Sequence, residues 1–495
     1  MSVDKFLSRS AQALPNKAAI HYEKDIITYS QLNQEVNNLA QGLIDLGLKT
    51  SDKAAVILGN CPDFVRIYFA ILRAAGTVVP LNPLFKEDEI QYIINDAKIK
   101  FLVINHDLLP TIKKISAEIS HIKIIVIGGT KETNIIPFED LLNKEANPVE
   151  LYVEEKDLAA CLYTSGTIGN PKGALLSHSN LIFLTEALVT RMDMRTEDNS
   201  LCIIPLSHIF SQLTNMLMPI CLGGNVTILP RFIPRAALNE IASKRISYLC
   251  AVPAMYAALL SALSHDRNFN ISTLRICVSG GAPLPLEISK VFMEKYGIPL
   301  VEGSGPTEAV ACVGPHEANK PGSVGPALEG VKVKIVNEND QELSRGEIGE
   351  FCVQGPNVMQ GYLNLPEATA EAMKGGWFHT GDLAKIDEDN YVYIVGRKKD
   401  IILVGGMNVY PSEIEQCLYN HPEILEVAVI GIPDKDRGEM PKAFIVLKPG
   451  SNSEPKEFIL YCRKHLANYK CPKQVVILDS LPKNPTGKVD KKLLE

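Results

Sequence analysis

A regular alternation of short apolar runs and amphipathic segments constrains the fold most strongly. Apolar runs bounded by turn residues predict buried strands, and the segments between them carry apolar residues at helical spacing. The strands are expected at 54–58, 78–81, 101–105 and 123–128, and the helices between them at 63–75 and 85–97. Such alternation is typical of a parallel sheet covered by helices. The pattern resumes over 177–302, which predicts a second sheet of the same kind.

The pattern of expected secondary structure changes after residue 320. Short strands are expected at 331–336, 349–354 and 391–395, separated by Gly, Asn and Asp turns, which predicts a small β-barrel-like unit. A charged break, Arg397-Lys398-Lys399-Asp400, then precedes a last α+β segment. A chain of 495 residues exceeds one typical core. We therefore predict an α/β N-terminal domain over 1–398 and a smaller, mobile α+β C-terminal domain over 399–495.

Composition excludes several function classes. The net charge of −7 gives no basis for nucleic-acid binding, and 46% hydrophobic with 22% charged residues is ordinary for a globular protein. The eleven cysteines are scattered, form no CxxC pair and match no zinc-site spacing, which predicts reduced thiols in a cytoplasmic protein. The apolar stretch 213–229 is interrupted by Pro219, Gly223 and Gly224 and is too broken to span a bilayer, while peripheral membrane contact stays open.

The stretch 163–173, Tyr-Thr-Ser-Gly-Thr-Ile-Gly-Asn-Pro-Lys-Gly, is the strongest candidate for chemistry. Its small and hydroxyl residues can direct N–H groups and hydroxyls at a polyphosphate, with Lys172 as the cation. The Walker pattern fails, because Pro171 stands where a second Gly is required and Lys172 is not followed by Ser or Thr. We predict a phosphate-binding loop between a strand over 159–163 and a helix beginning near His178. The alternative is a glycine-rich turn without a ligand.

Three further segments carry candidate residues. Glu308, at the end of Gly-Ser-Gly-Pro-Thr-Glu, offers a hard oxygen ligand that suits Mg²⁺ beside a phosphate loop, although a lone Glu on a loop is more often only solvated. His208 follows a predicted strand, where a histidine is more often a core or capping residue than a catalyst. The small residues of 279–283 permit a flat ligand to approach the backbone closely, or form a simple turn.

Charged candidates also lie in the last quarter of the chain. Asp382, in Trp-Phe-His-Thr-Gly-Asp-Leu, offers a carboxylate that can hold a ribose diol by two hydrogen bonds. Arg397 stands just before the predicted domain boundary. The segment 482–488, Pro-Lys-Asn-Pro-Thr-Gly-Lys, is a turn-rich loop ending in Lys488, and a lone lysine in such a loop is usually solvated.

Together these segments resemble the adenylate-forming superfamily, which includes acyl-CoA synthetases, amino-acid adenylation domains and luciferases. The resemblance covers essentially the whole chain and rests on ordered matches at 163–173, 205–210, 303–308, 379–383, 396–411 and 482–488. The stretches 355–362 and 396–411 are most similar to bacterial medium- and long-chain fatty acyl-CoA ligases. Two positions depart from the family pattern. Ile168 stands where a Thr is usual, and Ser304 stands where many members place a Tyr that stacks on adenine.

The resemblance implies a role for each matching residue. The implied ligands of the β- and γ-phosphates are Thr164, Ser165, Gly166, Thr167 and Lys172. The metal ligands would be Glu308 and Thr164, and Thr307 would lie near the α-phosphate. The implied nucleoside contacts are Gly280, Gly281, Ala282 and Ser304 at the adenine, and Asp382 and Arg397 at the ribose. His208 would line the acyl site, and Lys488 would be the catalytic lysine of the first step. Lys399 would be the hinge, with Gly405 and Gly406 along the pantetheine path.

The function implied by the resemblance is an ATP-dependent acyl-CoA ligase. Such an enzyme forms an acyl-AMP from a carboxylic acid, here a medium- or long-chain fatty acid, and transfers the acyl group to coenzyme A. ATP, Mg²⁺ and coenzyme A are the implied cofactors, and a monomer or homodimer is expected. An aryl-CoA ligase, a fatty acyl-AMP ligase that loads an acyl carrier protein, and an inactive binding homologue stay open. Ser211 after Phe210, in place of an acidic residue, argues against an amino-acid adenylation domain.

Overall fold

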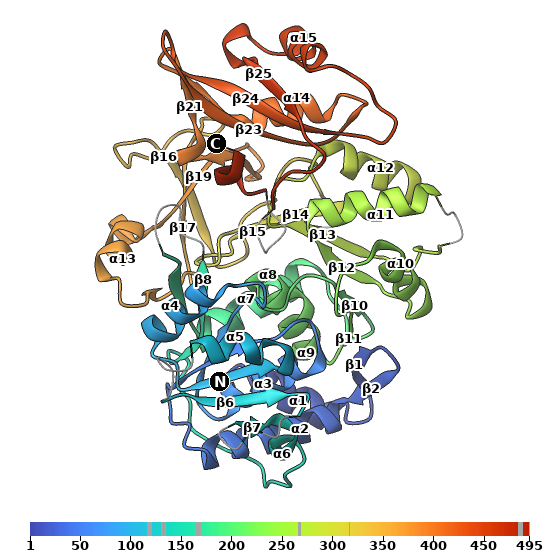
Figure 1. The fold of residues 1–495 in the computed structure, drawn as a ribbon, viewed down its shortest axis with the longest axis vertical. Helices are drawn as coiled ribbons and strands as arrows, with labels where there is room; N and C mark the ends of the chain where they lie inside the picture. The colour runs from blue at the N-terminus through green and yellow to red at the C-terminus, as the bar shows by residue number, and fades with distance from the viewer. Residues whose placement is uncertain are drawn as a thin grey trace.

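The structure is a computed structural model that describes residues 1–115, 121–129, 132, 135–164, 170–265, 269–315, 317–483 and 489–494. Figure 1 shows a large body built from the first three quarters of the chain and a smaller unit, formed by the last part, seated at one end of it. The mixed α/β architecture, with two large helix-covered sheets, confirms the fold class predicted from the alternating pattern.

The first large sheet is built around parallel strands from the first third of the chain. Its strands lie in the order β18 (Gly361–Tyr362), β9 (Lys172–Ser177), β8 (Leu158–Thr164), β4 (Thr77–Pro80), β3 (Lys53–Ile57), β5 (Phe101–Asn105), β6 (Lys123–Ile127) and β7 (Ile136–Pro137). Strands β8 to β7 run parallel, whereas β9 and β18 are antiparallel additions at one edge. This edge carries the phosphate-loop candidate.

The second large sheet repeats the plan. Its strands lie in the order β15 (Cys312–Val313), β14 (Leu300–Ser304), β13 (Ile276–Gly280), β12 (Tyr248–Ala251), β10 (Asn199–Cys202), β11 (Asn225–Ile228), β1 (Ala18–Tyr22) and β2 (Asp25–Thr28). The six central strands are parallel, and β15 and β2 close the edges antiparallel. In parallel sheets ligands bind beyond the carboxyl ends of the strands, so the ends of β13 and β14 are the expected ligand side.

Helices cover both sheets. They are α1 (Lys5–Ala13), α2 (Tyr29–Asp45), α3 (Pro62–Arg73), α4 (Glu87–Ala97), α5 (Leu109–Lys114), α6 (Phe138–Leu142), α7 (His178–Arg191), α8 (Ile209–Gln212), α9 (Met218–Leu222), α10 (Pro234–Ser243), α11 (Pro253–His265) and α12 (Leu286–Tyr296), with short turns at η1 (His106–Leu108) and η2 (Leu213–Leu217). Helix α2 begins with a capping box, in which the Gln31 backbone N–H donates to Thr28 Oγ1 and the Thr28 backbone N–H donates to Gln31 Oε1. No helix of the described chain combines the length and apolarity required to cross a membrane.

Alternating burial along the strands shows how the layers pack. On β3, Val56 belongs to a large core shared by both sheets, whereas its neighbours Ala55 and Ile57 belong to a second core beneath α4 and α5. Successive side chains of a strand point to opposite faces, so β3 is buried on both sides, as parallel strands generally are. The large core also includes Phe351 of the third sheet, which therefore packs as part of the large body.

The last third of the chain supplies two smaller sheets. The third sheet has the order β16 (Lys332–Val336), β17 (Gly349–Gln354), β19 (Phe378–Ile386) and β20 (Val392–Arg397), all antiparallel, with α13 (Pro366–Ala372) and η3 (Lys374–Gly376) between its strands. After η4 (Lys398–Asp400), the fourth sheet has β22 (Met407–Val409), β21 (Ile402–Val404), β24 (Gly438–Leu447) and β23 (Ile424–Asp434), with β25 (Gln474–Ile477) beside β24. Its helices are α14 (Pro411–Tyr419) and α15 (Pro455–His465), with η5 (Asn468–Lys470) and η6 (Lys491–Leu494).

The fourth sheet has its own cores. Val427 and Val429 of β23 face one core with α14 and α15, and the alternate residues Ala428 and Ile430 face another with Leu494. These cores contain no residue before 402 among the described residues, so the unit carries its own packing. The position of the boundary between 398 and 399 stays a prediction.

The phosphate-loop candidate differs from the sequence expectation in its surroundings. A helix does begin at His178, but strand β9 is inserted between the loop and that helix and pairs antiparallel with β8. Strands β8 and β9 thus form an antiparallel pair, called the β8–β9 hairpin below, in which Thr164 lies directly opposite Lys172. A Cβ at Gly173 would lie 2.8 Å from the Sγ of Cys161 and 3.2 Å from the Tyr163 ring, so a side chain at this position would require Cys161 to shift.

Candidate functional site

The candidate site lies where the β8–β9 hairpin meets the segment after β14. Thr164 ends β8, and its Oγ1 donates a hydrogen bond of 3.2 Å to Oε1 of Glu308. The hydroxyl of Tyr362, on β18, donates a second hydrogen bond of 3.0 Å to the same oxygen. Glu308 is buried, with 7% of its surface exposed. Three segments far apart in the sequence therefore converge on one buried carboxylate.

A strap formed by residues 355–362 holds this arrangement together. The Met359 backbone N–H donates to the Glu308 carbonyl at 2.8 Å, and Asn357 Nδ2 donates to the Val310 carbonyl at 2.9 Å. Asn180 of α7 in turn donates through Nδ2 to the Pro356 carbonyl at 2.7 Å. The strap thus ties the Glu308 segment of the second sheet to the hairpin edge of the first. Sequence reasoning used this stretch only for its resemblance and assigned Tyr362 no role.

The backbone at Gly305 is as tightly constrained as the side chains around it. A Cβ at this position would lie 2.3 Å from the Cα of Val310, so no residue with a side chain fits without moving the backbone. The chain folds back on itself here, and the Ala311 backbone N–H donates to the Ser304 carbonyl at 3.3 Å. Ser304 and Thr307 are both half-buried on this turn.

Lys172 is the cation of the site. Its Nζ lies 5.1 Å from the centre of the Tyr362 ring, a cation–π arrangement. Within the described chain no carboxylate forms an ion pair with it, although it is half-buried. A cation placed in this way is electrostatically prepared for an incoming anion. Ser165, Gly166 and Thr167, also predicted to hold phosphates, lie outside the described residues.

The donor set fits Mg²⁺ bound together with phosphates. Mg²⁺ typically takes one or two carboxylates and completes its shell with water and substrate phosphates, instead of a cage of protein ligands. No group of three or more His, Cys, Asp or Glu side chains suited to a metal occurs among the described residues. Glu308 offers a single buried carboxylate, and both hydrogen bonds donated to it by described residues reach Oε1, none Oε2. The chemistry therefore suits a metal shared with a nucleotide.

Asp382 and Arg397 form the second charged element of the site. They are directly opposite each other on β19 and β20, and Arg397 Nε lies 2.7 Å from Asp382 Oδ1. Asp382 is buried, whereas Arg397 is exposed. The Asp382 backbone N–H donates to Thr380 Oγ1, which fixes the strand at this point. The structure thus brings together the two residues predicted to bind a ribose.

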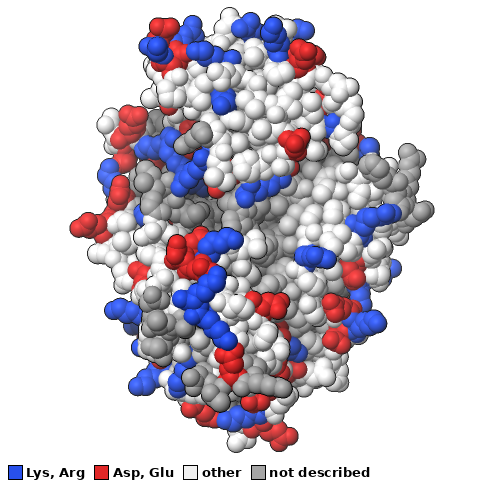
Figure 2. All heavy atoms as spheres, in the orientation of Figure 1, with Lys and Arg blue, Asp and Glu red and all other residues white. Residues whose placement is uncertain are grey.

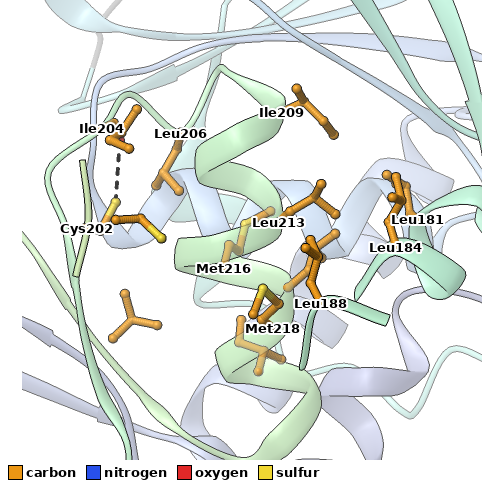
Figure 3. Close-up of a cluster of buried hydrophobic side chains, with 14 of the residues drawn as sticks. Leu181, Leu184, Leu188, Cys202, Ile204, Leu206, Ile209, Leu213, Met216 and Met218 are labelled. Atoms are coloured by element: carbon orange, nitrogen blue, oxygen red, sulfur yellow. Dashed lines mark hydrogen bonds between the residues drawn. The ribbon is translucent and has the colours of Figure 1, made fainter. Parts of the chain in front are cut away.

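A helix between the two large sheets forms the wall opposite the Gly-rich strand end. Figure 3 shows α8, η2 and α9 as one continuous helix, with Leu213, Met216 and Met218 packed among apolar side chains and Leu181, Leu184 and Leu188 of α7 alongside. The turn η2 is a π-helix, a widened form often found at functional sites. His208 caps this helix, because its Nδ1 accepts from the Phe210 backbone N–H at 3.2 Å.

Phe210 closes against the end of β13. A Cβ on Gly280 would lie 3.1 Å from the Phe210 ring, so the ring packs directly on the glycine backbone. Thr214, one turn later, donates through Oγ1 to the Phe210 carbonyl at 2.7 Å. Gly280 is buried beneath the Phe210 ring, whereas Gly281 and Ala282, in the loop that follows β13, are exposed. Gly281 and Ala282 are thus accessible to a flat ligand.

Glu302 is a buried titratable group that sequence reasoning missed. It lies on β14 opposite Ser279 of β13 and is 9% exposed. Burial raises the pKa of Glu302 to about 7, although the backbone N–H groups of Leu284 and Gly322 hydrogen-bond the carboxylate and oppose this shift. The Leu284 hydrogen bond, 3.3 Å long, anchors the loop that follows Gly280. Only tertiary burial marks this residue, and no local pattern signals it.

The structure describes three of the predicted residues of the C-terminal unit, which are Lys399, Gly405 and Gly406. Lys399 is exposed on η4, and Gly405 and Gly406 form the two-residue turn between β21 and β22, both with positive φ, as a type I′ hairpin requires. Lys488 lies outside the described residues. Figure 2 shows basic side chains on the edge of this unit that faces the large body, beside a hollow between the two.

The family comparison covers nearly the whole chain. The profile of the AMP-binding enzyme family matches residues 7–363, and the profile of the AMP-binding enzyme C-terminal domain matches residues 413–488. The first range contains the β8–β9 hairpin, Glu308 and Tyr362. The second contains most of the fourth sheet.

Individual relatives are similar over their full length. A long-chain-fatty-acid–CoA ligase of Bacillus subtilis (strain 168) is 34% identical over 530 residues, which covers 100% of this chain and 94% of the relative. A feruloyl-CoA synthase of Amycolatopsis sp is 34% identical, with 97% and 96% covered. The structure of ATP-bound MatB from Rhodopseudomonas palustris superposes with a TM-score of 0.92 at 33% identity, with 100% and 98% covered. The likeness therefore extends to both units of the molecule.

Proposed function

Because the chain belongs to the AMP-binding enzyme family and is an AMP-forming acid–CoA ligase, we propose that its acid substrate is a medium- or long-chain fatty acid. This proposal rests mainly on the absence of Asp, Glu, Lys and Arg from the segments around Phe210. No Asp, Glu, Lys or Arg occurs in 199–230, 248–264 or 276–286, the segments that form the helix and strand ends there. A second charged group on the substrate would be buried against these segments without an ion-pair partner, which is costly. An alkyl chain carries no charge and has no such cost. The B. subtilis relative supports this choice.

In the proposed first step an oxygen of the acid carboxylate attacks the α-phosphorus of ATP, the bond from the α-phosphorus to the β-phosphate oxygen breaks, and acyl-AMP forms as pyrophosphate leaves. Two anions approach each other, so the barrier is largely electrostatic. Lys172, with Thr164, Ser165, Gly166 and Thr167, holds the β- and γ-phosphates, while Thr307 lies near the α-phosphate. When bound, Mg²⁺ would neutralise phosphate charge, with Glu308 and Thr164 as its protein ligands. Lys488 supplies a further positive charge near the reacting oxygen.

The nucleoside and acyl groups occupy the remaining elements in this proposal. The Asp382 carboxylate and Arg397 hold the ribose hydroxyls, and the ion pair between them fixes the carboxylate in place. The adenine lies along Gly280, Gly281 and Ala282, with Ser304 on its other side. His208 and Phe210 line the entrance of the proposed acyl site.

The second step needs a different arrangement of the two units. The thiol of coenzyme A must reach the acyl carbonyl, so Lys488 must leave and the hairpin carrying Gly405 and Gly406 must approach. Lys399, exposed on the connection after β20, is the proposed hinge for this rotation. The separate cores of the fourth sheet support movement of that unit as a rigid body.

An aryl-CoA ligase is the second candidate, favoured by one specific observation. The Phe210 ring packs on the Gly280 backbone, so an aromatic ring stands at the end of β13. A planar aromatic acid would pack favourably against such a ring. The feruloyl-CoA synthase relative and the structure of an anthranilate CoA ligase, at 28% identity and a TM-score of 0.93, support this alternative.

A pyrophosphate-release screen separates the candidates. Acetate, benzoate, ferulate, octanoate and palmitate are each supplied with ATP and Mg²⁺, with and without coenzyme A. We expect the highest kcat/KM for octanoate or palmitate, and an acyl-CoA product by mass. A preference of tenfold or more for ferulate or benzoate would establish the aryl alternative instead. Acyl-AMP accumulation that coenzyme A does not relieve would indicate a carrier-protein acceptor.

A further inference from the structure

The backbone of Tyr362 is fixed at the edge of the phosphate hairpin. Strand β18 pairs with β9, with Tyr362 opposite Ala174, and the Leu363 backbone N–H donates to the Gly173 carbonyl at 2.8 Å. The Tyr362 backbone N–H donates to Thr369 Oγ1 at 2.9 Å, which ties β18 to the start of α13. Its side chain is therefore presented to the site from a rigid support.

One side chain here contacts both charges of the site. The Tyr362 hydroxyl donates to Glu308 Oε1 at 3.0 Å, and its ring lies 5.1 Å from Lys172 Nζ. The hydroxyl is the donor in the hydrogen bond to Glu308, because an ionised carboxylate can only accept. Tyr362 places a carboxylate and a cation at fixed positions relative to each other.

The orientation of the Glu308 carboxylate follows from its two donors. Thr164 Oγ1 and the Tyr362 hydroxyl both reach Oε1, which restricts rotation of the carboxylate about its terminal bond. Within the described chain Oε2 receives no hydrogen bond. Hydrogen bonds to a metal-binding carboxylate commonly fix its orientation and contribute to metal affinity.

We propose that Tyr362 is a positioning residue that acts through two neighbours. Its hydroxyl turns Oε2 of Glu308 toward the metal, and its ring holds Lys172 at the hairpin until nucleotide phosphates draw the ammonium away. The inference rests on the proposed nucleotide and metal roles of Glu308 and Lys172. The two functions of Tyr362 are separable, because one belongs to the hydroxyl and the other to the ring.

The variant Tyr362→Phe removes the hydroxyl and keeps the ring. We expect its Kd for Mn²⁺ in the presence of α,β-methylene-ATP, measured by water-proton relaxation, to rise roughly tenfold. The Mg²⁺ concentration that half-activates pyrophosphate release should rise by a similar factor. The KM for ATP at saturating Mg²⁺ should change less than about twofold, since Lys172 keeps its ring contact.

The variant Tyr362→Leu removes both features and should add a rise in the KM for ATP. Tyr391→Phe is the matched control, because the Tyr391 ring lies 4.4 Å from Lys320 Nζ, away from the site, and its hydroxyl also donates a hydrogen bond. This control should leave metal and ATP dependence unchanged. In a Glu308→Gln background Tyr362→Phe should have no further effect on Mn²⁺ binding, because the hydroxyl acts through that carboxylate.

The outcomes distinguish this inference from the proposed function. Wild-type Mn²⁺ affinity and Mg²⁺ dependence in Tyr362→Phe, with wild-type protein active, would overturn the positioning role alone. An equal loss in Tyr362→Phe with and without Glu308 would also overturn it, because the effect would then bypass the carboxylate. Failure of wild-type protein to release pyrophosphate with any acid would instead contradict the proposed function. Circular dichroism and melting temperature check that each variant is folded.

Discussion

Two lysine–tyrosine pairs in this molecule have the same chemistry and opposite surroundings. Lys320 lies over the Tyr391 ring and also binds Asp387 at 2.7 Å and Asp389 at 2.6 Å. Hydrogen bonds to these two carboxylates raise the pKa of Lys320 well above its ordinary value. Lys172 lies over the Tyr362 ring, but no carboxylate of the described chain forms an ion pair with it. The charge of Lys320 is neutralised within the fold, whereas the charge of Lys172 is paired with no carboxylate of the described chain.

The two regions also differ in the direction in which the pKa of a carboxylate is shifted. For Asp387, burial opposes ionisation, but hydrogen bonds from Lys320 and the Tyr391 backbone outweigh it, and the pKa is lowered. For Glu302, behind the proposed nucleotide loop, burial dominates and raises the pKa to about 7. A fold optimised for stability alone would pair or replace such groups. Unsatisfied charge concentrated around the proposed site is expected where ligands supply the missing interactions.

The largest expected effect is a difference in kcat/KM for ATP between variants of the two lysines. Lys172→Met should lower kcat/KM for ATP in acid-dependent pyrophosphate exchange by roughly a thousandfold, the loss typical when a donor to developing charge is removed. Lys320→Met should keep kcat/KM within about twofold. Methionine preserves the length of the apolar stem, so the comparison isolates the charge. Equal losses in both variants would show that Lys172 acts through stability and not through the nucleotide.

The next effect in size is a pH-dependent change in the free energy of unfolding when the buried Glu302 is replaced. Glu302 binds its proton more tightly in the folded state than in the unfolded state, so its contribution to stability is present below about pH 4.5 and is lost as pH rises through about 7. Glu302→Gln removes the ionisation, and relative to wild type it should gain about 3 kcal/mol of unfolding free energy at pH 8 and little at pH 5. Urea denaturation at both pH values measures the difference. A gain independent of pH would contradict the burial of an ionisable Glu302.

The contrast also shows which parts of the site a sequence can reveal. Glu308 and Thr164 are separated by 144 positions, and only the ordered resemblance indicated that they would meet. Tyr362 and Glu302 escaped prediction because their importance arises from tertiary contacts: a hydroxyl that reaches a buried carboxylate, and a carboxyl whose pKa burial raises. The resemblance identified the segment containing Tyr362, but no pattern within it indicated which side chain faces the charges.

For the fold too, elements with a clear local sequence pattern were predicted and elements without one were missed. Helices with clear periodicity, such as α3 and α4, were predicted at 63–75 and 85–97 and are confirmed. Strand β9 was missed because its short run, Lys172 to Ser177, begins inside the phosphate-loop stretch and lacks alternation of its own. The helix of α8, η2 and α9 was missed because it is buried on all sides, so it carries no amphipathic stripe, and Pro219 interrupts it.

The smallest expected effect concerns the stability supplied by the neutralised pair. Lys320 is partly exposed, with 34% of its side chain accessible, so solvent screens its two ion pairs. Lys320→Met should therefore lower the unfolding free energy only slightly at low salt, and by less in 0.5 M NaCl. In Lys172→Met the stability should be unchanged or slightly raised, because no ion pair of the described chain is lost. Urea denaturation of both variants at two salt concentrations compares them directly. A larger, salt-sensitive loss for Lys172→Met than for Lys320→Met would reveal a carboxylate partner for Lys172 and would remove the basis for calling its charge reserved for a ligand.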